Sequence, residues 1–260
     1  MLSTSQKWPK DWMVLGFFVV LVLFQIPTAI IIRDISIPLG VLLNEYVLLM
    51  GGSLLVALRW GNFSNLFPFQ KREKKTFFWA ILMTLALVVI IDGIAFWSEK
   101  IFPLPPEIKA MLKKLMTVHS WQEGVWRWFL LCITPALCEE IFFRGLFQNT
   151  LAHRWNRKSA LIMTAVAFAA IHGIPQYFHL YLLLGFYLGW LMLESRSLFF
   201  PILAHFINNS WTFINFCLGN ETVVGDNWHG TDTLMIALAL FVFFVSAFRF
   251  RESCRKIQNS

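Results

Sequence analysis

Long runs of apolar residues constrain the fold of this chain more than any other feature of its sequence. A run of about 20 apolar residues is long enough to cross the hydrocarbon core of a bilayer as a helix. Inside that core only helices and closed barrels satisfy their own backbone hydrogen bonds. The sequence predicts an all-α polytopic membrane protein with about eight transmembrane helices. The predicted spans are residues 12–32, 37–58, 75–97, 125–152, 159–174, 177–194, 198–217 and 232–248.

The composition agrees with this class of protein. The chain is 57% hydrophobic and only 14% charged, whereas a soluble domain carries about 25% charged residues. Its length of 260 residues suits one bundle, so we expect a single integral membrane domain over residues 1–260. The four cysteines have neither disulfide-framework nor zinc-site spacing, and we interpret them as buried thiols.

Lysine and arginine residues are unequally divided between the two sides of the predicted bundle. Cytoplasmic loops carry an excess of these residues, so we expect both termini in the cytoplasm. The net charge of +7 then reflects orientation in the membrane and predicts no nucleic-acid partner. The only long loop on the opposite side, residues 98–124, could form an interfacial amphipathic helix. The terminal side contains Lys7, Lys10, Arg59, Lys71, Arg72, Lys74, Lys75, Arg154, Arg157, Lys158, Arg196, Arg249, Arg251, Arg255 and Lys256, and the other contains Arg33, Lys100, Lys109, Lys113, Lys114 and Arg127.

The fourth predicted span contains two adjacent glutamates and an arginine. Ionisable residues inside a membrane are costly and by default indicate a functional site. Glu140 and Arg144 are one helical turn apart, so they can neutralise each other. Glu139 points about 100° away around the helix and has no such local partner. Glu139 is therefore the first candidate for a chemical role.

Two later spans supply polar partners at the same one-turn spacing. Phe168 can pack against His172 in the fifth span, and His205 and Asn209 share a face in the seventh. At about 1.5 Å per residue, Glu139 and His172 lie about 20 Å from the cytoplasmic ends of their helices, and His205 and Asn209 about 10 and 16 Å. We expect these side chains to meet in one pocket. The alternative is that they only form hydrogen bonds between helices.

The three motifs Glu-Glu-x-x-x-Arg, Phe-x-x-x-His and His-x-x-x-Asn occur in order on successive polar spans. In this combination the chain resembles the CAAX protease and bacteriocin-processing family of intramembrane endopeptidases, also called the Abi family. The region that carries the resemblance covers residues 125–215. The motif positions are Glu139, Glu140, Arg144, Phe168, His172, His205 and Asn209.

These residue types also suit the hydrolysis of an amide bond. That reaction needs a base for water, a donor for the oxyanion and an acid for the leaving amine. Glu139 with His172 can activate a water molecule, and Asn209 with His205 can donate hydrogen bonds to the oxyanion. The resemblance implies the same roles, with the Glu-x-x-x-Arg pair as a supporting ion pair.

A metal ion is an alternative for the same residues. Glu139, His172 and His205 would be the ligands if zinc is bound, with an open position for water. We favour a mechanism that requires no cofactor, because no carboxylate is evidently left as the base if Glu139 is a ligand.

The leading hypothesis is an intramembrane endopeptidase that cuts a membrane-associated protein or peptide, located in the bacterial inner (plasma) membrane. A non-catalytic protein for bacteriocin immunity or scaffolding is the alternative. A proton- or metal-coupled transporter is a third reading, but the sequence has neither paired broken helices nor repeat symmetry. The partners expected are the substrate and the lipid bilayer. The sequence indicates neither the identity of the substrate nor the oligomeric state.

Two further acidic residues lie in predicted spans without belonging to a motif. Glu45 is in the second span and Asp92 in the third. We expect structural roles for both, such as pairing with Arg127, and a place in a substrate channel is the alternative.

Overall fold

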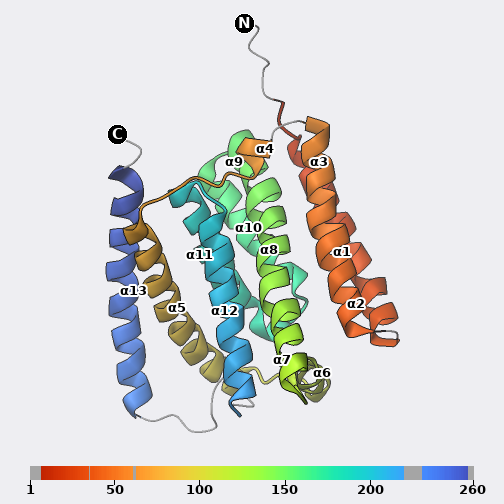
Figure 1. Cartoon of the computed structure of the whole chain (residues 1–260), viewed down its shortest axis with the longest axis vertical. Coiled ribbons are helices and arrows are strands. Elements are labelled where there is room, and N and C mark those ends of the chain that lie inside the picture. Colours follow the sequence, from red (N-terminus) through yellow and green to blue (C-terminus); the bar gives the residue numbers. More distant parts are fainter. Residues whose placement is uncertain (1–6, 35, 61–62, 220–229, 257–260) are drawn as a thin grey trace, which may run out of the picture.

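The computed structural model describes residues 7–34, 36–60, 63–219 and 230–256, and every regular element within them is a helix. This confirms the all-α prediction. Figure 1 shows the longer helices side by side, with their axes along the long dimension of the molecule. The elements are α1 (Asp11–Asp34), α2 (Ile37–Leu42), η1 (Leu43–Gly51), α3 (Gly52–Trp60), α4 (Phe63–Leu66), α5 (Lys74–Ile101), α6 (Pro106–Met116), α7 (Trp121–Trp128), η2 (Phe129–Ile133), α8 (Thr134–Glu140), η3 (Ile141–Gln148), α9 (Asn149–Arg154), α10 (Arg157–Ile171), η4 (Pro175–Tyr177), α11 (Phe178–Ser195), α12 (Phe199–Cys217) and α13 (Gly230–Lys256).

The predicted transmembrane runs coincide with these helices. Residues 37–58 fall on the continuous helical segment α2–η1–α3, and residues 125–152 fall on the segment that runs from α7 to α9. Within the described ranges, the segments long and apolar enough to cross a membrane are Pro38–Trp60, Lys74–Ile101, Pro175–Ser195 and Asp232–Arg255. The chain is an all-α, polytopic membrane protein.

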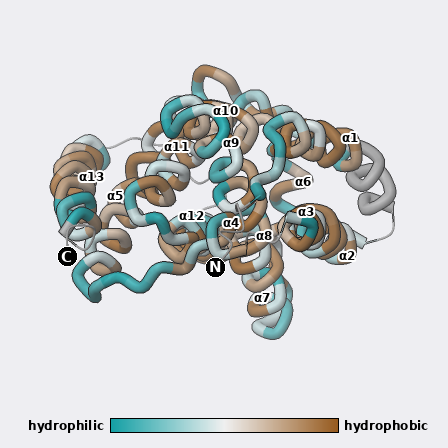
Figure 2. The backbone as a smooth tube through the Cα atoms, turned by 90° about the horizontal axis from the view of Figure 1, so that it is seen from above, coloured by the Kyte–Doolittle hydropathy of each residue, from teal (hydrophilic) through white to brown (hydrophobic). Residues whose placement is uncertain are grey.

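The outer helices present apolar side chains to their surroundings. On α13, Leu234, Phe241 and Phe248 are 72%, 67% and 68% exposed. Figure 2 shows hydrophobic residues along α13 at one flank of the bundle and along α1 at the other. Apolar surface on this scale is unusual on a soluble monomer and is suited to contact with lipid.

The helix that carries the glutamate pair contains a proline and two widened turns. Pro135 lies in the first turn of α8 and has no backbone N–H to donate. The π-helical turns of η2 end immediately before α8, and those of η3 begin directly after Glu140. Short π-helical segments are rare inside α-helices and frequently occur at functional sites. The glutamate pair therefore lies between two local departures from α-helical geometry.

A short turn and a close approach set the end of α10 beside the start of α11. α10 ends at Ile171, and Gly173 follows with a positive φ of 64°, a conformation that glycine adopts without strain. Further along α11, a Cβ atom on Gly185 would lie 3.1 Å from the Cα atom of Ala165 in α10. Glycine thus permits contact between the two backbones, and His172 lies at the end where the helices connect.

Residues 98–124 contain the helix expected there, which is α6. Figure 1 places α6 and the start of α7 at one end of the bundle, whereas α1 begins and α13 ends at the opposite end. Arg127 fastens α6 to α7, because it pairs with Glu123 at 2.7 Å and donates a hydrogen bond to the carbonyl oxygen of Lys114 at 2.9 Å.

The expected pairing of Arg127 with the acidic residues of the second and third spans is therefore wrong. Glu45 accepts a hydrogen bond from Asn44 Nδ2 at 3.4 Å, and Asp92 accepts one from Trp211 Nε1 at 2.6 Å. The physical reason is local: Arg127 has a carboxylate one turn away on its own helix and carbonyl groups at the end of α6. These partners are closer along the chain than a carboxylate inside the bundle.

Candidate active site

Glu140 is fully buried and binds one group a turn away on its own helical segment and one from a distant part of the chain. Its Oε1 accepts hydrogen bonds from Arg144 Nη1 at 2.7 Å and from His205 Nδ1 at 2.9 Å. Arg144 Nη2 also donates to the carbonyl oxygen of Gly185 in α11 at 3.2 Å. The ion pair expected from the one-turn spacing is formed, and it additionally connects this helix to α11 and α12.

The contact with Glu140 fixes how His205 is oriented. A carboxylate only accepts hydrogen bonds, so Nδ1 of His205 carries a hydrogen and donates it. The ring of His205 is 2% exposed and meets the ring of Phe168 edge-on at 5.8 Å between centroids. Nε2 is left as the ring nitrogen that can act on a bound molecule.

Phe168 lies at the centre of the cluster and packs against three charged or titratable groups. Its ring centroid is 4.8 Å from that of His172, and the guanidinium carbon of Arg144 lies 4.5 Å from the same ring. The face of an aromatic ring attracts a cation. Phe168 therefore stabilises Arg144 on one side and supports both histidines.

His172 caps the end of α10 and is held from two directions. Its Nδ1 lies 2.7 Å from the backbone carbonyl oxygen of Phe168, so Nδ1 is the donor and Nε2 is free to accept. Its ring stacks on the ring of Tyr181, with centroids 3.9 Å apart and planes inclined by 23°. A neutral imidazole held in this way presents a basic nitrogen, as a general base requires.

Glu139 differs from Glu140 in having no partner that occupies its carboxylate. Its Oε2 is buried without a hydrogen-bond partner among the described residues, as is Oε2 of Glu140, but Oε1 of Glu139 also lacks the hydrogen bonds that hold Oε1 of Glu140. The carboxylate interacts electrostatically with His205 and with Glu45 of η1. A buried carboxylate oxygen without a protein partner is able to bind a water molecule and to take its proton.

Asn209 is anchored by both ends of its carboxamide. Its Nδ2 donates to the carbonyl oxygen of Leu131 at 3.3 Å, and its Oδ1 accepts from Asn208 Nδ2 at 3.2 Å. An amide nitrogen carries two hydrogens, so one remains for another acceptor. The contacts fix the side chain so that this second hydrogen has a defined direction.

The expected metal ligands do not form a complete ligand set. In the part of the chain that the structure describes, no group of three or more His, Cys, Asp or Glu side chains could hold a metal ion. The described residues therefore do not form the zinc site considered from the sequence.

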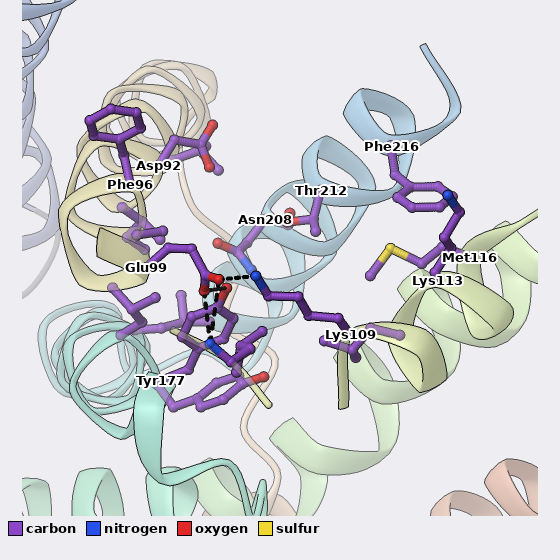
Figure 3. Close-up of a pocket in the computed structure, with 18 of the residues that line it drawn as sticks. Asp92, Phe96, Glu99, Lys109, Lys113, Met116, Tyr177, Asn208, Thr212 and Phe216 are labelled. Carbon is purple, nitrogen blue, oxygen red and sulfur yellow. Dashed lines mark hydrogen bonds and ion pairs between the residues drawn. The ribbon is translucent and has the colours of Figure 1, made fainter. Parts of the chain in front are cut away.

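A cavity of about 540 Å³ lies next to this cluster, between α5, α6, α11 and α12. This volume is within the range of small-molecule and peptide side-chain pockets. Figure 3 shows Glu99 near its centre, bound to Lys109 of α6, with Asp92 and Thr212 further along the wall. Glu99 also accepts a hydrogen bond from the backbone N–H of Leu104 at 3.2 Å, which fixes the chain where it enters α6.

Two residues join the cavity to the candidate catalytic groups, and neither was identified from the sequence. Tyr181 lines the cavity and stacks on His172, and Asn208 lines the cavity and donates to Asn209. Asn208 occupies the last variable position of the third motif, directly before Asn209, and this was the one available signal for it. No sequence pattern indicated Tyr181, because its contact with His172 depends on the turn between α10 and α11.

Comparison with known proteins matches part of the chain to a family. Residues 120–211 match the model of the type II CAAX prenyl endopeptidase Rce1-like family. This confirms the resemblance that the three motifs indicate and supports a CAAX-type intramembrane peptidase as the general class. No curated protein and no solved structure matches the chain.

Proposed function

We propose that this protein is an intramembrane endopeptidase that hydrolyses a peptide bond of a membrane-associated protein or peptide. The observation that carries the proposal is the contrast between the two adjacent glutamates. Glu140 is held at its Oε1 by both Arg144 and His205, whereas no hydrogen bond or ion pair holds either oxygen of Glu139 among the described residues. One carboxylate thus serves the structure and the other is available for chemistry.

In the proposed reaction, Glu139 and Nε2 of His172 orient and activate one water molecule. The water oxygen attacks the carbonyl carbon of the scissile bond, and its proton passes to Glu139. The carbon–nitrogen bond then breaks while Glu139 returns that proton to the leaving amine. The mechanism needs no cofactor.

The negative charge that develops on the carbonyl oxygen needs hydrogen-bond donors. The remaining Nδ2 hydrogen of Asn209 supplies one. His205 supplies a second from Nε2 when its ring is doubly protonated, while its Nδ1 donates to the carboxylate of Glu140. The network around Glu140 would then support catalysis as well as folding.

The substrate can be sought in the native host by mass spectrometry of the termini of membrane proteins. We expect a strain without this chain to accumulate at least one uncut membrane-associated precursor, and the gene restored in the same strain to remove it. A protein that acts only by sequestration or as a scaffold would leave all termini unchanged. That result would contradict the proposed activity and favour the non-catalytic alternative.

We further propose that the protein lies in the bacterial inner membrane with both termini in the cytoplasm. The basis is the excess of Lys and Arg on the side of the bundle where α1 begins and α13 ends. The cavity lies toward the α6 end, and in this orientation it opens away from the cytoplasm.

Cys217, exposed at the end of α12 beside the cavity, reports this orientation directly. We expect a membrane-impermeant maleimide added outside intact spheroplasts to label it. As a control, Lys71→Cys in a Cys217→Ser background should react only after the membrane is opened, because Lys71 is exposed at the other end. If Lys71→Cys reacts in intact spheroplasts and Cys217 reacts only after the membrane is opened, the termini lie outside.

A further inference from the structure

We infer that Tyr181 is a positioning residue of the proposed peptidase, which holds the imidazole of His172 by stacking and forms the wall between the cavity and the catalytic groups. The inference rests on the proposed function. Tyr181 lies in the first turn of α11, and its ring centroid is 3.9 Å from that of His172. No motif includes this residue.

His172 needs such support because of its place in the fold. It is the cap of α10 and is followed by Gly173, so no further helical turn surrounds its ring. One hydrogen bond, from Nδ1 to the carbonyl oxygen of Phe168, fixes a single point of the ring. The ring could still swing about that point. Contacts with the rings of Phe168 and Tyr181 limit this motion, and together they set the direction of Nε2.

Tyr181 also stands where the cavity meets the site. It lines the cavity together with Leu180 and Leu184 of the same helix, and its hydroxyl group interacts electrostatically with Glu139. A peptide that reaches Glu139 from the cavity therefore passes this ring. Figure 3 shows Tyr177 and Asn208, which line the same cavity from η4 and from α12.

The ring of Tyr181, rather than its hydroxyl group, makes the contact with His172. The hydroxyl has no hydrogen-bond partner among the described residues. The packing of α11 does not depend on Tyr181 either, because Gly185 and Gly189 hold it through their carbonyl oxygens. Gly185 accepts from Arg144 at 3.2 Å, and Gly189 accepts from Gln148 at 2.9 Å. Loss of the ring should thus disturb His172 and leave the helices in place.

The experiment compares Tyr181→Leu, Tyr181→Phe and the control Phe178→Leu in the full-length protein. Phe178 is a partly exposed aromatic residue on the same helix. It does not line the cavity, and it makes no ring contact with His172. The assay is cleavage of the precursor found in the native host, with kcat and KM measured separately. We expect Tyr181→Leu to lower kcat by about 10²-fold, the cost of misplacing a catalytic group by about 1 Å. Tyr181→Phe should restore kcat, and Phe178→Leu should not change it.

A second measurement does not require a substrate. The measurement is NMR spectroscopy of protein that carries 13C-labelled histidine. The signal of His172 is identified by its absence in the variant His172→Gln. The ring current of Tyr181 should change the chemical shift of that signal. We expect the shift to disappear in Tyr181→Leu and to remain in Tyr181→Phe, at an unchanged melting temperature. If the wild-type protein cleaves no precursor, the proposed function fails. The chemical shift of His172 then still tests whether the ring of Tyr181 stacks on its imidazole. Unchanged kcat in Tyr181→Leu, or equal losses in the Leu and Phe variants, would overturn the inference.

Discussion

Glu139→Gln is expected to lower the rate of peptide cleavage by about 10²–10⁴-fold, the usual contribution of a general base. Glutamine has nearly the same shape as glutamate but cannot take a proton from water. The buried Oε2 of Glu139 has no hydrogen-bond partner among the described residues, so the fold does not depend on its charge. The melting temperature in detergent should therefore be no lower than that of the wild type.

The matched control for this variant is Glu107→Gln. Glu107 is exposed on α6 and does not line the cavity. The variant Glu107→Gln should therefore cleave the precursor at the wild-type rate. Rates are measured on purified, detergent-solubilised protein with the precursor found in the native host. Cleavage by Glu139→Gln at the wild-type rate would show that Glu139 is not the base.

Glu140→Ala is expected to act mainly on stability. The change leaves Arg144 buried without its carboxylate and leaves His205 Nδ1 without an acceptor. Breaking a buried ion pair from one side costs about 3–5 kcal/mol, because an uncompensated charge remains. The melting temperature and the yield of folded protein should both fall clearly below those of Glu139→Gln.

A double variant separates the two roles of Glu140. Glu140→Gln with Arg144→Met removes both buried charges, and this is far less costly than the removal of one. We expect most of the stability to return. Activity should stay low, because the carboxylate that accepts the hydrogen bond from His205 Nδ1 and orients the ring is still absent. If Glu140→Ala melts at the wild-type temperature, or if the double variant regains full activity, the assignment of Glu140 is wrong.

The sequence by itself determined the class of fold and indicated the motif residues of the candidate site, but not Tyr181 or Asn208. Apolar runs of bilayer length can satisfy their backbone only as helices, so the spans followed from the pattern alone. The Glu140–Arg144 pair also followed, because residues one turn apart face each other on any helix. These features are local in the chain, and the helical period fixes them before any helix packs against another.

Only the tertiary structure decided how the helices complete the site. Glu140 and His205 are 65 residues apart in sequence, and no periodicity relates α8 to α12. The stack of Tyr181 on His172 depends on the turn at Gly173, and the cavity depends on where α6 meets α5. Arg127 was misassigned for the same reason, since its partners lie at the end of α6. Contacts between helices depend on packing angles and turns, and these are set by the shapes of many side chains at once.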